Sequence, residues 1–187
     1  MSETLIAIDP GHGENTPGKR SPASLGQPVL REYRFNRQVA ALVEDLLQRC
    51  GITFSRTVPA DRDLPSGTRL ANARGCQLFV SIHANAGGGT GIETFYSPGH
   101  AQSQRLARLI QREVIRETGM RDRGIKTQNL WVTRETPKRG LTGCLVELGF
   151  MDYGPDLAKL REESYRRRCA VGIVKGICLY LGVPFTP

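Results

Sequence analysis

The sequence predicts an α/β layer structure, and two observations support this prediction. Short apolar runs alternate with longer segments whose apolar residues recur at helical spacing. The chain has 187 residues, which is enough for one hydrophobic core, and it contains no internal repeat, low-complexity tract or linker. We therefore expect a single domain over residues 1–187.

The first half of the chain predicts three strands and two helices. Apolar runs predict strands over residues 5–8, 52–55 and 78–82. A stretch rich in Pro, Gly and Ser predicts a long loop over residues 15–30. Residues 33–50 have one apolar side and are followed by Gly51, which predicts a helix with a glycine stop. Ser66 is expected to cap a second helix that runs to about Gly75.

The second half predicts three more strands and two more helices. Gly87 to Gly91 form a glycine-rich, flexible turn, and apolar runs then predict strands over residues 92–96, 130–133 and 144–148. Helical spacing of apolar residues predicts helices over residues 102–117 and 163–181. Gly182 follows the last helix as its expected stop, with Pro184 beyond it.

Composition and charge exclude several classes of function. The net charge of +8 favours encounter with polyanions such as the acidic polymers of a bacterial wall. The basic residues are dispersed and do not interleave with aromatic ones, so we expect no nucleic-acid binding. No apolar segment is long enough to span a membrane, and the first residues do not form a secretory signal. We expect cytoplasmic synthesis followed by release, or a domain excised after its leader. The five cysteines have irregular spacing, and most of them are expected to be small buried side chains.

Two of the three histidines follow predicted strands. His12 comes shortly after the first strand, and His83 directly follows the run LFVSI. Because functional groups of open α/β sheets gather at the carboxyl ends of strands, these two imidazoles are expected to face each other as metal ligands. The glycines beside His12 are expected to let the backbone turn sharply there. His100 lies in a polar segment and is expected on the surface or at a helix start.

Three acidic residues are candidates for the same site. Glu147 lies inside the apolar run CLVELGF, so it is either a strand-end residue that reaches solvent or a general base near the metal. Glu32 begins a predicted helix, where it could serve the helix dipole or act as a third ligand. Asp9 lies between a strand and a proline, and could orient an imidazole without binding the metal itself.

Six segments together resemble a known family. IAIDPGHG, LREYRFNRQVAALV, FVSIHAN, GIETFY, RGIKTQNLWV and LVELGFMD resemble, in this order, the zinc N-acetylmuramoyl-L-alanine amidases of the third amidase class, which include autolysins and phage endolysins. The resemblance covers about residues 4–181. It implies a twisted, mostly parallel sheet of about six strands with helices on both faces. It also implies that His12, Glu32 and His83 bind one Zn²⁺ per chain and that Glu147 is the catalytic carboxylate.

The resemblance further implies a substrate and a reaction. The enzyme would hydrolyse the amide between the lactyl group of N-acetylmuramic acid and the L-alanine of the peptidoglycan stem peptide. Arg123, Lys126 and Asn129 are candidates for substrate contact, and residues 15–30 and 87–91 are expected to shape the groove. Asp152 stands where asparagine is frequent in the family, which affects substrate contacts more than catalysis. We expect a monomer. Two alternatives remain: a zinc peptidase that cuts within the stem peptide, and a non-catalytic wall-binding or nucleic-acid-binding module.

Overall fold

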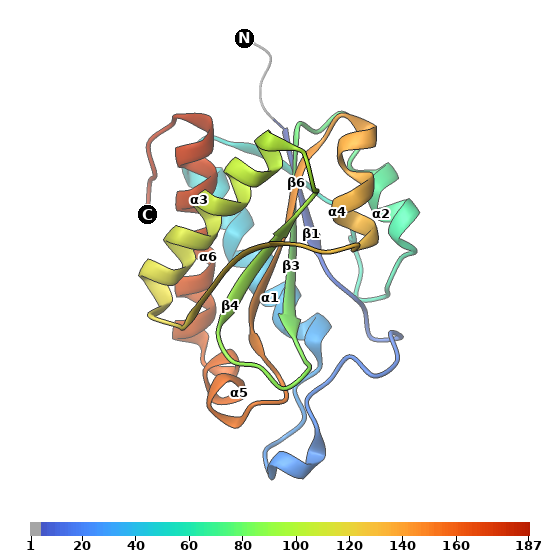
Figure 1. Ribbon diagram of the computed structural model, residues 1–187, viewed down its shortest axis with the longest axis vertical. Helices are drawn as coiled ribbons and strands as arrows, with labels where there is room; N and C mark the ends of the chain where they lie inside the picture. Colours follow the sequence, from blue (N-terminus) through green and yellow to red (C-terminus); the bar gives the residue numbers. More distant parts are fainter. Residues whose placement is uncertain (1–4) are drawn as a thin grey trace.

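Six strands form one twisted sheet in the computed structural model, which describes residues 5–187 (Figure 1). The strand order is β2-β1-β3-β6-β4-β5. Strands β1, β2, β3 and β6 are parallel, whereas β4 runs antiparallel to β6 and pairs in parallel with β5. The expected mostly parallel sheet of six strands is therefore confirmed. The strand bounds are β1 Leu5–Pro10, β2 Thr53–Arg56, β3 Leu78–Asn85, β4 Ile92–Tyr96, β5 Asp122–Thr127 and β6 Thr142–Phe150.

Helices cover both faces of the sheet, as expected (Figure 1). One face packs against three long helices, α1 (Glu32–Arg49), α3 (Ala101–Thr118) and α6 (Glu163–Leu181). The other face packs against two short helices, α2 (Ser66–Asn72) and α4 (Trp131–Glu135). The helix α5 (Gly154–Arg161) contacts β6 and α6. Among the helices of residues 5–187, none is long and apolar enough to cross a membrane.

The alternation of side chains along each strand separates an apolar face from a mixed one. Ile8, Ile82 and Val146 point into the core beneath the long helices. Ala7 and Phe79 point to the opposite face, into a small apolar cluster that includes Leu70 of α2 and Val132 of α4. This second cluster covers only part of its face. Polar side chains can therefore occupy the remaining positions of the same strands, towards their carboxyl ends.

Four elements differ from the sequence predictions. Residues 130–133 were expected as a strand, but the helix α4 begins at Trp131, so tertiary packing overrides the strand propensity of the run LWV. Ser66 is the first residue of α2 and not its cap, because Pro65 occupies the cap position. The strand β5 and the helix α5 were not predicted. β5 is an edge strand of the sequence DRGIKT without apolar alternation, and among the strands of residues 5–187 it pairs only with β4.

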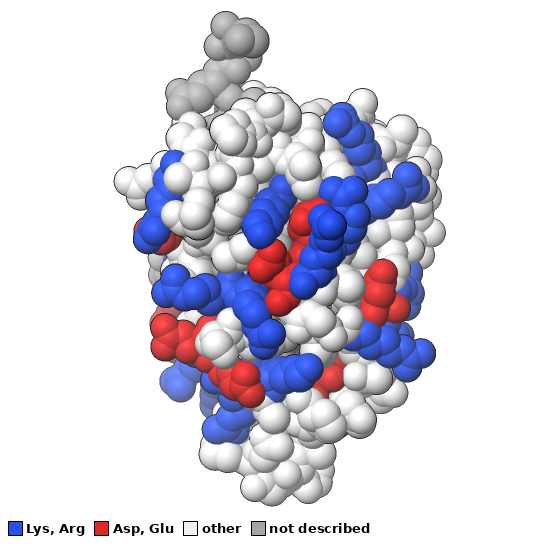
Figure 2. Space-filling view, turned by 90° about the vertical axis from the view of Figure 1, so that its left-hand side faces the viewer, with Lys and Arg blue, Asp and Glu red and all other residues white. Residues whose placement is uncertain are grey.

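Several smaller predictions are confirmed. His100 is the N-cap residue of α3, and its imidazole accepts a hydrogen bond from the backbone N–H of Ser103. All five cysteines are free, and all but Cys50 are buried. On the face of the molecule shown in Figure 2, Lys and Arg side chains are interspersed with Asp and Glu. The positive charge is thus dispersed on this face, as expected.

Candidate active site

Strand register brings two predicted site residues side by side at the carboxyl end of the sheet. His83 on β3 is the register partner of Glu147 on β6, and Glu147 is in turn the partner of Glu93 on β4. Register partners on neighbouring strands point to the same face of a sheet. The three side chains therefore form a row on the face that carries the short helices.

Two further residues complete the cluster that the sequence predicted. Glu32 Oε1 lies 3.0 Å from His83 Nδ1 and 3.5 Å from His12 Nε2. The two imidazole rings are 4.9 Å apart between centroids and nearly perpendicular. One donor atom from each of His12, Glu32 and His83 lies within 4.8 Å of the others. The structure thus brings together all three expected ligands.

The turn that presents His12 works differently from the sequence expectation. His12 itself has a positive φ of 59°, whereas neither flanking glycine does. The glycines instead allow close approach, because a Cβ on Gly11 would lie 2.1 Å from His83 Cε1. A Cβ on Gly13 would lie 2.1 Å from the backbone nitrogen of Asp63. The expectation that the glycines supply the turn is therefore wrong, and their role is to leave room for the imidazole and for a neighbouring loop.

The first turns of α1 hold this strained segment in place. Asn36 Nδ2 donates to the backbone oxygen of Gly11 at 2.9 Å, and Arg37 Nη1 donates to that of His12 at 2.9 Å. The backbone N–H of Glu32 donates to the carbonyl of Lys19 at 3.0 Å, which ties the long loop to the start of the helix. Sequence reasoning missed Asn36 and Arg37, because their role depends on contacts across 25 residues of chain.

The charges of the cluster suit a cation. Burial, helped by His83, lowers the pKa of His12 to about 4, so its imidazole is neutral near pH 7. Burial alone would raise the pKa of Glu32, but the two histidines lower it, so the carboxylate is ionised. Burial alone would lower the pKa of His83, but Glu32 raises it. The same carboxylate that favours an imidazolium also favours a metal cation between the three side chains. Two imidazoles and one carboxylate are a common ligand set for catalytic zinc, so these residues fit the ion.

Glu147 has the environment of a base. Its Oε2 is enclosed and has no hydrogen-bond partner among the described residues. Burial raises the pKa of Glu147 to about 7, with His83 acting in the opposite direction. A carboxylate with a pKa near neutrality can both accept and return a proton.

The cluster opens into a cavity of about 380 Å³. The expected loop over residues 15–30 contributes to it, but the glycine turn 87–91 does not line it. That turn is anchored, because Asp152 Oδ2 accepts hydrogen bonds from the N–H groups of Gly87 and Gly88 at 2.7 and 2.8 Å. The lining residues are His12, Pro17, Gly18, Lys19, Glu32, His83, Ala84, Asn85, Ala86, Glu147 and Met151.

The expected substrate contacts lie outside this cavity. Arg123 and Lys126 both bind Glu93 Oε2, at 2.5 and 2.6 Å, at the end of the row that contains Glu147. Asn129 accepts a hydrogen bond from Arg134 at 2.8 Å. Arg123 and Lys126 lie on β5, two strands away from Glu147 on β6, while Asn129 lies beyond the end of β5.

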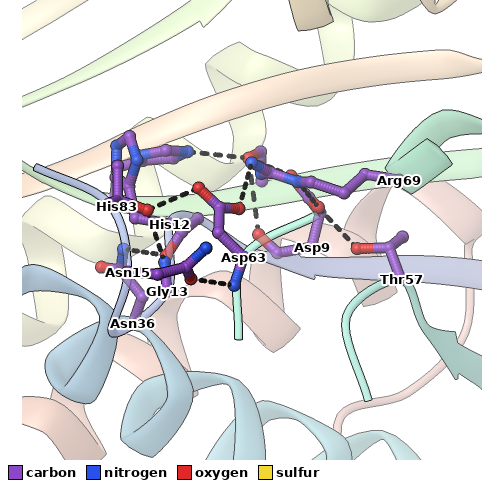
Figure 3. A network of polar contacts seen from close by, with 12 residues as sticks. Asp9, His12, Gly13, Asn15, Asn36, Thr57, Asp63, Arg69 and His83 are labelled. Carbon is purple, nitrogen blue, oxygen red and sulfur yellow. Dashed lines mark hydrogen bonds and ion pairs between the residues drawn. The ribbon is translucent and has the colours of Figure 1, made fainter. Parts of the chain in front are cut away.

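Asp9 makes its hydrogen bonds to residues other than the two imidazoles. It binds Arg69 through both carboxylate oxygens and accepts a hydrogen bond from Thr57 Oγ1 at 2.5 Å (Figure 3). It also accepts a hydrogen bond from Ser81 Oγ at 2.5 Å, and Ser81 Oγ lies 3.1 Å from His83 Nε2. Asp9 therefore reaches an imidazole through one hydroxyl group. No local pattern in the sequence indicates a role for Arg69 or Ser81.

An α/β domain with two histidines and two carboxylates around a cavity at the carboxyl ends of its strands has the arrangement of a hydrolase. Comparison with known proteins defines the family. Residues 6–178 match the family described as N-acetylmuramoyl-L-alanine amidase. The chain belongs to this family.

Individual relatives agree with the family match. The chain is 34% identical over 177 residues to the N-acetylmuramoyl-L-alanine amidase CwlM of Bacillus licheniformis, covering 92% of this chain and 66% of that protein. It is 31% identical to the catalytic domain of CwlV, an amidase of Bacillus (Paenibacillus) polymyxa, with a TM-score of 0.86 over 97% of this chain and 99% of that one. An amidase of Clostridium difficile 630 is 32% identical, with a TM-score of 0.87 over 97% and 98% of the two chains.

Proposed function

We propose that this protein is a zinc-dependent N-acetylmuramoyl-L-alanine amidase and that residues 1–187 form one catalytic domain. It would cleave the amide between the lactyl group of N-acetylmuramic acid and the L-alanine of the stem peptide. The observation that carries the proposal is the juxtaposition of three donor atoms within 4.8 Å of one another with Glu147, whose Oε2 has no partner among the described residues. The family match supports the substrate.

His12, Glu32 and His83 would hold one Zn²⁺ per chain. When bound, zinc would polarise the scissile carbonyl and lower the pKa of water towards neutrality. The neutral imidazole of His12 and the ionised carboxylate of Glu32 are already in the protonation states that metal binding requires. The three side chains come from the end of β1, the start of α1 and the end of β3, so the fold sets the geometry of the site.

Glu147 would act as the catalytic base. It would take a proton from the attacking water and then pass it to the nitrogen of the leaving L-alanine. Its pKa of about 7 suits both transfers near neutral pH. The neighbouring carboxylate Glu93 is neutralised by Arg123 and Lys126, so it does not compete for the proton.

The substrate would enter the cavity beside Lys19 and the loop that precedes α1. A positive net charge of +8 assists approach to an anionic cell wall. Arg123, Lys126 and Asn129 remain proposed contacts for parts of the substrate that extend beyond the cavity. We further propose that the protein acts as a monomer on the cell wall, as an endolysin or an autolysin would.

Substitution of Glu147 separates the proposed base from the proposed metal ligands. Glu147→Gln should retain about one zinc per chain and lose lysis of purified cell walls. His83→Ala, as the matched variant, should lose both zinc and lysis. Unchanged lysis by Glu147→Gln contradicts the role of the base. Unchanged zinc content in His83→Ala contradicts the ligand set.

The rival functions make different predictions in the same assay. A peptidase on this scaffold would cut between amino acids of the stem peptide, and a wall-binding module would cut nothing. The enclosed carboxylate next to the three potential ligands favours an enzyme, since binding alone does not need it.

A further inference from the structure

A line of buried polar groups leads from His83 away from the cavity. Ser81 and His83 are two residues apart on β3, so their side chains point to the same face of the sheet. Asp9 on β1 is the register partner of Ser81. Arg69 reaches Asp9 from α2, which covers this face. The strand register therefore creates the line His83, Ser81, Asp9, Arg69, which lies on the side of the imidazole that faces away from Glu32.

The hydrogen-bond capacities of these groups set the direction of each bond. A carboxylate accepts only, and a serine hydroxyl has one proton to donate. The Ser81 proton is therefore directed to Asp9 Oδ2, 2.5 Å away. The Ser81 oxygen then accepts from His83 Nε2, 3.1 Å away, which must carry a proton. Asp9 is kept in its acceptor role by Arg69, which donates to both of its oxygens.

We infer that Ser81, backed by Asp9 and Arg69, is a positioning residue that holds His83 in the tautomer with the proton on Nε2. Without a metal, His83 Nδ1 donates to the carboxylate oxygen Glu32 Oε1, which lies 3.0 Å away. When zinc binds, Nδ1 gives up this proton, and the tautomer with the proton on Nε2 leaves the lone pair of Nδ1 free for the metal. The inference rests on the proposed zinc site, since it concerns which nitrogen of His83 is presented to the metal. Such partners of ligating histidines fix both ring orientation and tautomer.

A purely structural role for the same contacts is the alternative. Asp9, Ser81 and Arg69 connect β1, β3 and α2, so they could simply hold these elements together. Thr57 provides a matched control, because its hydroxyl donates to the other oxygen of the same carboxylate, also at 2.5 Å. Thr57 and Ser81 are both fully buried. Only Ser81 lies on the path to His83.

The test compares Ser81→Ala with Thr57→Val in the full chain. Zinc affinity is measured by competition with a chromophoric chelator, and thermal unfolding of the zinc-free protein is measured in parallel. We expect Ser81→Ala to weaken zinc binding by about 10- to 100-fold. Thr57→Val should lower the unfolding temperature by a similar amount to Ser81→Ala but leave zinc affinity within about twofold of the unmutated protein. An equal loss of affinity in the two variants, or no loss in Ser81→Ala, overturns the inference.

A spectroscopic measurement on the unmutated protein tests the tautomer without any substitution. Long-range ¹H–¹⁵N correlation spectra of the zinc-loaded chain should show His83 protonated at Nε2 and unprotonated at Nδ1. The opposite tautomer overturns the inference. Failure of the proposed zinc site is a separate outcome, because the unmutated protein would then bind no zinc. If only the positioning role of Ser81 is wrong, the unmutated protein still binds zinc.

Discussion

Ionised Glu147 should destabilise the folded, metal-free protein, so substitution of Glu147 by a neutral residue should increase the free energy of unfolding. The pKa of Glu147 is raised by burial from 4.5 to about 7, a difference of about 2.5 pH units. One such unit corresponds to about 1.4 kcal/mol, so ionised Glu147 lowers the free energy of unfolding of the metal-free protein by up to roughly 3 kcal/mol. Glu147→Gln should therefore be more stable than the unmutated protein by up to this amount above pH 7. For a chain of this length the gain corresponds to roughly 6–12 °C in the unfolding temperature.

The pH dependence identifies the cause. Because the folded carboxyl keeps its proton to higher pH than the unfolded one, the stability of the unmutated protein falls as the pH rises from about 4.5 to about 7. Glu147→Gln lacks this fall. The stability difference between the two proteins should be absent below about pH 4.5 and complete above about pH 7.

The assay is thermal unfolding in the presence of a chelator, between pH 4 and pH 8. Glu93→Gln is the matched control, because Glu93 is the register partner of Glu147 on β4. Burial alone would raise the pKa of Glu93, but its contacts with Lys126 and Arg123 lower it. Glu93→Gln should accordingly be less stable than the unmutated protein at neutral pH. A Glu147→Gln variant that is no more stable at pH 8, or equally stabilised at pH 4 and pH 8, would show that ionisation of buried Glu147 does not destabilise the folded protein.

Three further predictions concern the frame around the site. Gly11→Ala places a Cβ 2.1 Å from His83 Cε1 and should weaken zinc binding at least about tenfold. Gly154→Ala is the control, because Gly154 has open space around it and its substitution should leave zinc binding unchanged. Equal zinc affinities of the two variants in a chelator competition would contradict this prediction. Arg69→Met leaves Asp9 buried without its cation and should lower the free energy of unfolding by about 3–5 kcal/mol in urea titrations, and a loss below about 1 kcal/mol would argue against it. Burial alone would raise the pKa of Asp9, but Arg69 lowers it, so the contribution of the pair should be complete above about pH 3.8 and disappear at lower pH. Addition of free zinc at about 100 times its dissociation constant to the metal-free protein should increase the free energy of unfolding by about 2.7 kcal/mol and restore lysis. Identical unfolding temperatures with and without zinc would contradict a metal site.

The main features of the site could be predicted from the sequence because they depend on local patterns. His12 and His83 each follow an apolar run, and parallel strands place their carboxyl ends at one edge. Glu147 is conspicuous as a charged residue inside an apolar strand. Glu32 was ambiguous from the residues alone, because an acidic residue at a helix start has an ordinary explanation. Its place in the site came from the resemblance, and the geometry supports it.

The remaining features of the site and the fold depend on tertiary contacts that no local sequence pattern predicts. Ser81 and Arg69 meet Asp9 only through strand register and the packing of α2, across 72 and 60 residues of sequence. The positive φ of His12 is maintained by Arg37, which lies 25 residues away in the sequence. β5 carries no apolar alternation because it is an edge strand, and α4 forms where three residues with strand propensity pack against the sheet as a helix.

Identification of the bond that is cut is the decisive test of the proposed amidase activity. Purified peptidoglycan is digested with the zinc-loaded protein, and the products are analysed by mass spectrometry. An amidase should release peptides with a free L-alanine amino terminus and leave the glycan strands intact, and Glu147→Gln should release no peptide. Products that carry new amino termini from cuts within the stem peptide, or an unmutated protein that releases no peptide, would contradict it.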